Sequence, residues 1–414
     1  MKPLLIILLL TPLLQVMGQT STPDYPGFMQ AATENKYADC IRLGRDLVPY
    51  TRHPNILYKL AECYCQADSM QQSLRLLEEL ADKGLPYRVN ENPKLAMLTS
   101  RSAFAPIAAR FTANGKDIHR SADAFRLNDA QLIPEGIAAT GDGQRFFLGS
   151  LAQSKVVDHT MNNGQQKDLV SNGQYGLWMV VGMKVSADNK TLWLCSASER
   201  DSSNGYAGIF GIELATGRLV NKYTLDNKAG PHLFNDLVTT GDSLLYYTDS
   251  KAGNVYKLQL ASGRMTAIAN GFTYPNGIAR NDSSTVLYIA DFNGIKRIDL
   301  TNNTTEPLDS QVPTFLHQID GLYYYNNSLI AIQDSGNNDD RIVRFYLDAA
   351  GRHIIRVEVL QSYHPDFILP TTGVIVGNDF YYIANSQLRN LQPDGSLTNA
   401  ATLKRPLIKR LRLE

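Results

Sequence analysis

The sequence has no excess of charge and only one long apolar run. Lys plus Arg equals Asp plus Glu at 40 each, so no net field favours nucleic acid or an anionic membrane surface. Beyond the first residues, no stretch approaches the roughly 18 consecutive apolar residues of a membrane-spanning helix. The expected partners are therefore small molecules or proteins, and no transmembrane segment is expected.

Several short catalytic motifs are also missing. The sequence contains no G-x-S-x-G nucleophile elbow, no H-E-x-x-H zinc helix and no G-x-x-x-x-G-K-[ST] phosphate loop. These absences argue against an α/β-hydrolase, a zinc protease of that type and a P-loop nucleotide-binding protein.

Cysteine is scarce, with four residues in 414: Cys40, Cys63, Cys65 and Cys195. A disulfide from Cys40 to Cys63 or Cys65 is compatible with export. Burial of the same side chains as small apolar residues between helices is equally compatible. Cys195 has no obvious partner.

The N-terminus has the pattern of a cleavable export signal. Lys2 precedes an apolar run at 4–14, and Val16 and Gly18 occupy the two positions that set cleavage. We therefore expect a signal peptide at 1–18 and a mature protein that is periplasmic or secreted.

Residues 26–113 have helical periodicity and an internal repeat. The segment IRLGRDL at 41–47 aligns with LRLLEEL 33 residues later, close to the period of tetratricopeptide repeats. Ser69 with Gln72 predicts a capping box, Gly84 predicts a helix end, and Asn92 followed by proline predicts a helix start. About three helix pairs resembling tetratricopeptide repeats are expected, and they offer a surface for a protein partner.

From about residue 121 to 414 the period changes to 2, and six similar units follow one another. Each unit has a first strand with a motif like x-G-I or x-G-L, an aromatic-rich second strand and a third strand. The second strands are RFFLGS, TLWLCS, LLYYTD, VLYIAD, SLIAIQD and DFYYIAN, and the third strands are KVVDHT, GIFGIEL, NVYKLQL, GIKRIDL, RIVRFYL and QLRNLQP. The basic tail at 404–412 is expected to be a final strand with an exposed basic face. Six units predict a mainly β fold, a six-bladed β-propeller.

One position of each first strand, just before the glycine or its equivalent, should converge on the propeller axis. These six positions are Glu135, Val181, Asn235, Asn276, Asp320 and Thr372. Four of them carry carboxylate or amide oxygens, the hard donors that Ca²⁺ prefers, and His and Cys are absent. A calcium site at Glu135, Asn235, Asn276 and Asp320 is expected, with Mg²⁺ or Mn²⁺ as substitutes. The alternative is a polar channel lining solvated by water.

The motifs PEGIA, FNDL, PNGIA and IDGL resemble the calcium site of the family that comprises gluconolactonases, senescence-marker proteins and luciferin-regenerating enzymes. They also resemble paraoxonases and strictosidine-synthase-like proteins on the same fold, over roughly residues 130–400. The resemblance implies that Glu135, Asn276 and Asp320 bind the metal, that Asn235 lies against metal or substrate, and that Asp320 is the base. An aromatic after the first motif, a substrate-binding arginine and a paired histidine are not found.

Two functions follow from these expectations. The first is a calcium-dependent lactone or ester hydrolase, in which Asp320 or a nearby histidine activates water. His232 and His317, each three residues before such a position, are the histidines considered, and His317 is the favoured second catalytic residue; ordinary loop roles are the alternative for both. The second function is a non-catalytic propeller that calcium only stabilises and that binds a sugar, peptide or protein.

Overall fold

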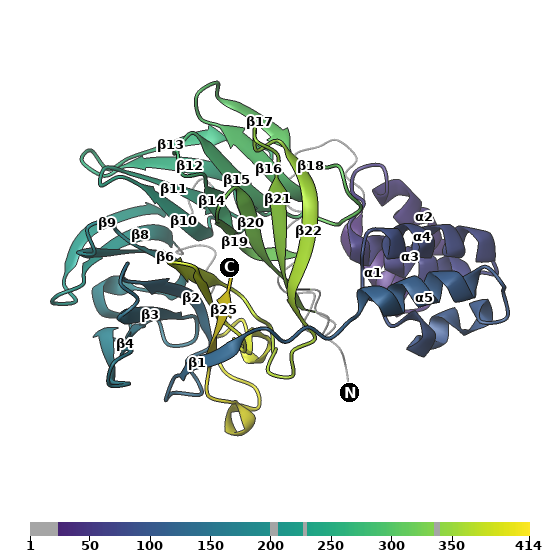
Figure 1. The fold of residues 1–414 in the computed structure, drawn as a ribbon, viewed down its shortest axis with the longest axis horizontal. Helices are drawn as coiled ribbons and strands as arrows, with labels where there is room; N and C mark the ends of the chain where they lie inside the picture. The colour runs from purple at the N-terminus through teal and green to yellow at the C-terminus, as the bar shows by residue number, and fades with distance from the viewer. Residues whose placement is uncertain (1–23, 199–205, 227–229, 335–339) are drawn as a thin grey trace.

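The computed structural model describes residues 24–198, 206–226, 230–334 and 340–414. It is a ring of six β-sheets with a helical segment at one side (Figure 1). This confirms the mainly β, six-bladed propeller that the repeated units predict. The expected signal peptide at 1–18 lies outside the described residues. Among the described helices, none is both long and apolar enough to cross a membrane.

From residue 24 onward, where the described structure begins, five α-helices and two short 3₁₀ helices precede the propeller. Their bounds are α1 Tyr25–Thr33, α2 Tyr37–Leu47, α3 Pro54–Gln66, α4 Met70–Asp82, η2 Val89–Glu91, η3 Pro93–Leu98 and α5 Phe104–Asn114. Leu57, Leu77, Leu80 and Phe111 are fully or almost fully buried in the core between these helices. A tetratricopeptide-like character and the domain limits 26–113 and 121–414 remain predictions.

The local signals in the helical segment have mixed outcomes. Gly84 follows α4 with φ of 78°, a left-handed conformation that glycine adopts without strain, so the predicted helix end is confirmed. The side chain of Asn92 accepts a hydrogen bond from the N–H of Lys94, but the element that it caps is a 3₁₀ helix. The capping box at Ser69 is wrong, because the Ser69 side chain makes no capping hydrogen bond.

A disulfide joins Cys40 on α2 to Cys63 on α3. Cys65 is buried and free on the same helix, within the core on the other side of α3. Cys195 is also free and buried, as its lack of an obvious partner suggested. Cys63 and Cys65 are two residues apart, so their side chains lie on different faces of the helix. Only Cys63 is on the face that meets Cys40.

The six sheets are numbered here as blades in chain order. Blade 1 contains β2 Pro134–Ala139, β3 Arg145–Ser150, β4 Val156–Thr160 and β5 Gln166–Val170; blade 2 contains β6 Met179–Val185, β7 Thr191–Ala197, β8 Tyr206–Glu213 and β9 Leu219–Asp226. Blade 3 contains β10 Phe234–Thr240, β11 Leu244–Asp249, β12 Asn254–Gln259 and β13 Arg264–Ala269; blade 4 contains β14 Ile278–Arg280, β15 Val286–Asp291, β16 Gly294–Asp299 and β17 Thr304–Pro307. Blade 5 contains β18 Asp309–Ser310, β19 Ile319–Tyr324, β20 Ser328–Gln333, β21 Arg341–Leu347 and β22 His353–Ser362.

Blade 6 is built from both ends of the propeller sequence. Its strands are β23 Gly373–Val376, β24 Asp379–Ile383, β25 Leu407–Arg412 and, at the edge, β1 Ala122–Arg126. Figure 1 shows β1 beside β25, and the two strands pair antiparallel. This pairing closes the ring, so that the first and last strands hold the propeller together.

The third strand of blade 6 differs from the prediction. QLRNLQP contains only a short 3₁₀ helix, Leu388–Asn390, and β25 takes the third-strand position instead. The expected exposed basic face is partly wrong, because the Lys409 ammonium is buried between the carboxylates of Asp123 at 2.6 Å and Asp366 at 3.0 Å.

The first strands of the blades stand close together around the axis. Each contacts the next, and β23 contacts β2. A Cβ added to Gly136 would lie 1.8 Å from the carbonyl oxygen of Val181, and one on Gly277 would lie 2.4 Å from that of Asp320. Glu135 and Asn276 are each followed by glycine because only a residue without a side chain lets neighbouring first strands come this close.

The helical segment is anchored to loops of blades 4 and 5. Phe315, in the loop before β19, is buried in the helical core. The carbonyl of Gly84 accepts a hydrogen bond from Arg341 Nη1 at 3.1 Å, and Tyr363 donates to the carbonyl of Pro86 at 2.7 Å. These contacts join helices and propeller through a shared apolar and polar interface.

Candidate functional site

The four predicted metal-ligating residues all lie at the start of first strands. Glu135 is in β2, Asn235 in β10 and Asp320 in β19, while Asn276 immediately precedes the turn into β14. In blades 1, 3 and 5 the register with the second strand shifts at these residues. Such bulges turn a side chain away from its regular direction, and here they occur where the chain meets the axis.

Asn276 and Asp320 are in direct contact. The side-chain amide of Asn276 donates a hydrogen bond to Oδ1 of Asp320, with 2.9 Å between nitrogen and oxygen. Gly277 N–H also donates to the carbonyl of Asp320, at 3.0 Å. Two of the four predicted residues are thus joined across neighbouring blades.

The carboxyl groups of Glu135 and Asp320 are buried near other negative charges. Burial raises the pKa of Glu135 well above its usual value, and the charges of Asp320 and Asp236 raise it further. Burial raises the pKa of Asp320 to about 7, the charge of Asp334 adds to this, and the Asn276 hydrogen bond opposes it. Repulsion among these carboxylates makes full ionisation costly without a nearby cation.

Asp236 is a functional candidate that the motif analysis missed. It occupies the position that is glycine in the other first strands, and its charge acts on Glu135, Asp320 and Tyr323. Its carboxylate accepts hydrogen bonds from the N–H groups of Leu237 at 2.8 Å and Ile278 at 3.3 Å. The sequence signal for Asp236 is the motif FNDL, in which aspartate stands where the other first strands have glycine.

Asn235 and Thr372, at two of the other first-strand positions, make hydrogen bonds within the propeller. Asn235 donates from its side chain to Ser250 Oγ at 3.0 Å, and Ser250 donates to the carbonyl of Pro275 at 2.6 Å. The hydroxyl of Thr372 donates to the backbone carbonyl of Glu135. Asn235 is therefore adjacent to the Asn276 turn, and its side-chain amide donates to Ser250.

His232 lies against a buried carboxylate. Its Nδ1 is 2.6 Å from Oδ2 of Asp249, the last residue of β11. The other oxygen of Asp249 accepts hydrogen bonds from the N–H groups of Leu233 and Ala252. Asp249 thus fixes the loop before β10 and orients the imidazole.

His317 packs under the helical segment. Its ring lies edge-on to the ring of His53, with 5.5 Å between centroids, and His53 stacks on Phe292 at 4.3 Å. Burial lowers the pKa of His317 to about 4, and the positive charge of Lys83 adds to this effect. Its Nδ1 is buried without a hydrogen-bond partner among the described residues. The catalytic role expected for His317 remains a prediction.

The residues around the axis fit a hard cation, although they do not include a cluster of carboxylates and histidines. Within the described ranges, no three or more His, Cys, Asp or Glu side chains form a group that could hold a metal. The expected set is two carboxylates and two amides, and Oε2 of Glu135 is buried with no hydrogen-bond partner. A buried carboxylate oxygen without a donor is chemically suited to a cation.

Sequence comparisons find no match, whereas structural comparison finds proteins with a similar fold. No protein-family model matches the chain, and no curated protein matches it. The allergen Mala s 1 of Malassezia sympodialis aligns at 12% identity over 71% of this chain and 96% of its own, with a TM-score of 0.52.

Two further solved structures align with a TM-score of 0.50. The calcium-binding protein regucalcin of Agrobacterium tumefaciens is 16% identical over 71% of this chain and 93% of its own. The PQQ-bound aldose sugar dehydrogenase of Streptomyces coelicolor is 12% identical over 72% and 97%. At such identities the likeness concerns the fold. The chain therefore shares the propeller fold of these solved structures.

Proposed function

We propose that this protein is an exported, calcium-dependent hydrolase of lactones or related esters. The observation that carries the proposal is the buried carboxylate pair Glu135 and Asp320, with an unpartnered oxygen on Glu135 and an Asp320 pKa near 7. A site that raises carboxyl pKa values by burial and mutual repulsion is typical of metal-binding and acid–base chemistry. Mg²⁺ or Mn²⁺ could replace Ca²⁺ at such oxygen donors.

In this proposal Glu135, Asn235, Asn276 and Asp320 hold the cation through oxygen atoms. When bound, Ca²⁺ would polarise the substrate carbonyl and stabilise the oxyanion. Asp320 accepts the proton of the attacking water, and Asn276 orients the Asp320 carboxylate through its hydrogen bond. The water oxygen bonds to the carbonyl carbon, the ring or ester C–O bond breaks, and the proton passes to the departing oxygen.

Export is supported by chemistry as well as by the N-terminal pattern. The Cys40–Cys63 disulfide is stable in oxidising compartments such as the periplasm or the extracellular space. The resemblance of the first-strand motifs to gluconolactonases supports a small lactone, ester or sugar as the ligand. A protein partner for the helical segment is a separate proposal.

A non-catalytic binding propeller is the second candidate. It is favoured by the helical segment, whose His53 and Asn55 contact the loop that leads to Asp320. A cation that only neutralises Glu135 and Asp320 would serve such a protein equally well. The two functions differ in whether calcium supports turnover.

The test is a panel of aldonolactones, aliphatic lactones and aryl esters, assayed with calcium and with a chelator. The proposal expects turnover of at least one substrate that the chelator abolishes and added calcium restores. Calcium binding without turnover on any substrate would support the binding propeller instead.

His232→Gln tests whether His232, instead of Asp320, is the base. Because Asp249 also holds two backbone N–H groups, we expect His232 to be mainly structural, with turnover retained in the variant. A loss of about 100-fold or more in kcat with unchanged calcium affinity would instead identify His232 as the base.

A further inference from the structure

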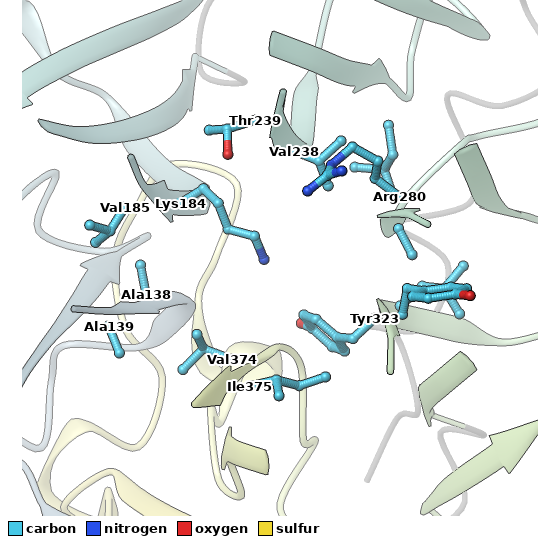
Figure 2. Close-up of a pocket in the computed structure, with 14 residues that line it drawn as sticks. Ala138, Ala139, Lys184, Val185, Val238, Thr239, Arg280, Tyr323, Val374 and Ile375 are labelled. Carbon is cyan, nitrogen blue, oxygen red and sulfur yellow. The ribbon is translucent and has the colours of Figure 1, made fainter. Parts of the chain in front are cut away.

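The far end of the channel holds a second cluster of chemically active side chains. A cavity of about 270 Å³ is lined by residues of all six first strands, each two to four positions beyond the six positions expected to converge on the axis, four of which form the candidate calcium site. Because the strands run away from that site, the cavity lies at the opposite mouth of the same channel. Figure 2 shows its lining, with Lys184, Arg280 and Tyr323 around the opening.

Lys184 is a cation without a close counter-ion. It lies in β6, and its ammonium reaches into the opening (Figure 2). Among the described residues it forms neither a salt bridge nor a hydrogen bond, and its nearest recorded partner is the ring of Tyr323, with 5.5 Å from Nζ to the centroid. A protein that encloses an ammonium in this way normally supplies an anion for it.

Arg280 brings a second positive charge to the same cavity. Its Nη1 donates to the carbonyl of Asn281 at 3.0 Å and to the hydroxyl of Ser284, which fixes the guanidinium at the mouth. Nε and Nη2 have no recorded partner within the described ranges. The charges of Arg280 and Lys184 repel each other, so an anion between them would relieve the repulsion.

No carboxylate of the described residues forms a direct ion pair with either cation of this cavity. Asp236 is the carboxylate whose charge acts on Lys184, and both its oxygens already accept backbone hydrogen bonds. It forms no salt bridge with Lys184 in the described structure. The charges of Asp320 and Glu135 also act on Tyr323, and that of Asp282 acts on Tyr324, but none of these carboxylates forms a salt bridge with Lys184 or Arg280 in the described structure.

The rest of the lining is apolar or aromatic. Ala138, Val185, Val238, Ile278, Val374 and Ile375 form the walls. The Tyr323 hydroxyl accepts a hydrogen bond from the N–H of Gly373 at 2.6 Å, which leaves its own proton available to a ligand. An anionic head with an apolar body suits this combination better than a fully hydrated inorganic ion.

We propose that this mouth of the channel is a binding site for a small organic carboxylate, held by Lys184, Arg280 and Tyr323. The carboxylate accepts hydrogen bonds from the ammonium and the guanidinium, while the apolar body contacts the aliphatic walls. The proposal does not rest on the calcium site or on the proposed hydrolysis, although the charges of Asp236, Asp320 and Glu135 reach Tyr323.

Benzoate is a suitable probe. Benzamide is the control that keeps the ring but lacks the charge, and inorganic phosphate is the control that keeps the charge but lacks the apolar body. Titrations are made by calorimetry on the whole protein after a chelator has removed metal and has itself been dialysed away, so that benzoate cannot bind through a metal and the carboxylates of the chelator cannot compete with it. The proposal expects benzoate to bind, benzamide to bind at least about tenfold more weakly, and phosphate to bind more weakly than benzoate.

Lys184→Met keeps the length of the side chain and removes its charge, and Arg280→Gln provides a second variant should the first fail to fold. Each should weaken benzoate binding about tenfold or more. Lys190→Met, at the exposed turn after β6, is the matched control and should bind benzoate as the unmodified protein does. Absence of benzoate binding, equal binding of benzamide, tighter binding of phosphate, or unchanged affinity in folded Lys184→Met would each overturn the proposal.

Discussion

The amide of Asn276 donates a hydrogen bond to Asp320, 2.9 Å away, although 44 residues separate the two in sequence. The contact joins blades 4 and 5 at the channel and opposes the pKa increase that burial imposes on Asp320. The hydrogen bond thereby couples the packing of two neighbouring blades to the protonation of Asp320.

Asn276→Ala should raise the pKa of Asp320 above about 7, because the variant removes the hydrogen bond that favours the ionised carboxylate. Carbon NMR of labelled aspartate in chelator-treated protein would follow the titration. Asn235→Ala is the matched control, since the Asn235 amide bonds to Ser250 and does not contact Asp320. An unchanged Asp320 pKa in Asn276→Ala would show that the hydrogen bond is not formed in solution.

Glu135→Gln should stabilise the metal-free protein at pH 8. Because the folded pKa of Glu135 lies above the unfolded value, the folded state loses stability as pH rises between the two values. A neutral amide removes this loss, and we expect a higher free energy of unfolding than that of the unmodified protein at pH 8.

Calcium should then stabilise the unmodified protein but not Glu135→Gln, because one carboxylate ligand is gone. Thermal unfolding with chelator and with calcium measures both effects. Glu91→Gln, on the exposed surface of η2, should behave like the unmodified protein in both conditions. A metal-free variant that is less stable than the parent at pH 8 would contradict the repulsion account.

The interface between the helices and the propeller should weaken in acid. Burial lowers the pKa of His317 to about 4 and that of His53 well below its usual value, so both are neutral in the folded state. The unfolded state takes up protons first, and stability is therefore lost as pH falls from about 6.5 to about 4. The full effect of His317 is on the order of 3 kcal/mol.

Chemical denaturation across this pH range would measure the slope. His317→Gln should flatten it, and the double variant His53→Gln, His317→Gln should flatten it further. The same slope in all three proteins would mean that other groups cause the acid sensitivity.

Phe315→Ala should separate the helical segment from the propeller. Phe315 is 4% exposed within the helical core, and the guanidinium of Arg341 lies over its ring at 4.2 Å. Loss of such a buried ring typically costs about 3–5 kcal/mol. We expect a separate, earlier helical unfolding transition by circular dichroism, whereas Ile355→Ala, at an exposed position, should leave a single transition. One unchanged transition in Phe315→Ala would contradict the anchoring role.

The repeat pattern predicted the propeller because every blade buries the same kinds of residue at the same places. Glu135, Asn276 and Asp320 could be aligned for that reason, each followed by a glycine that the close first strands require. Asp236 was missed because it replaces that glycine, so a pattern search treats it as an exception.

The last blade could not be predicted from local pattern alone. QLRNLQP has the alternation of a strand, yet β25 takes its place because β25 can pair with both β24 and β1. Likewise, Lys409 belongs to a basic segment but is buried, since Asp123 and Asp366 from distant parts of the chain meet it. Such choices depend on contacts between segments far apart in sequence.

The central claim is that the carboxylates at the channel bind calcium, and calorimetric titration of the chelator-treated mature protein with Ca²⁺ tests it most directly. The account predicts one site per chain, and at least about tenfold weaker binding in Asp320→Asn. Asp242→Asn, in the exposed turn after β10, should keep the parent affinity. Absence of calcium binding, or equal affinity in Asp320→Asn and the parent, would contradict the account and leave these residues as a polar lining of the channel.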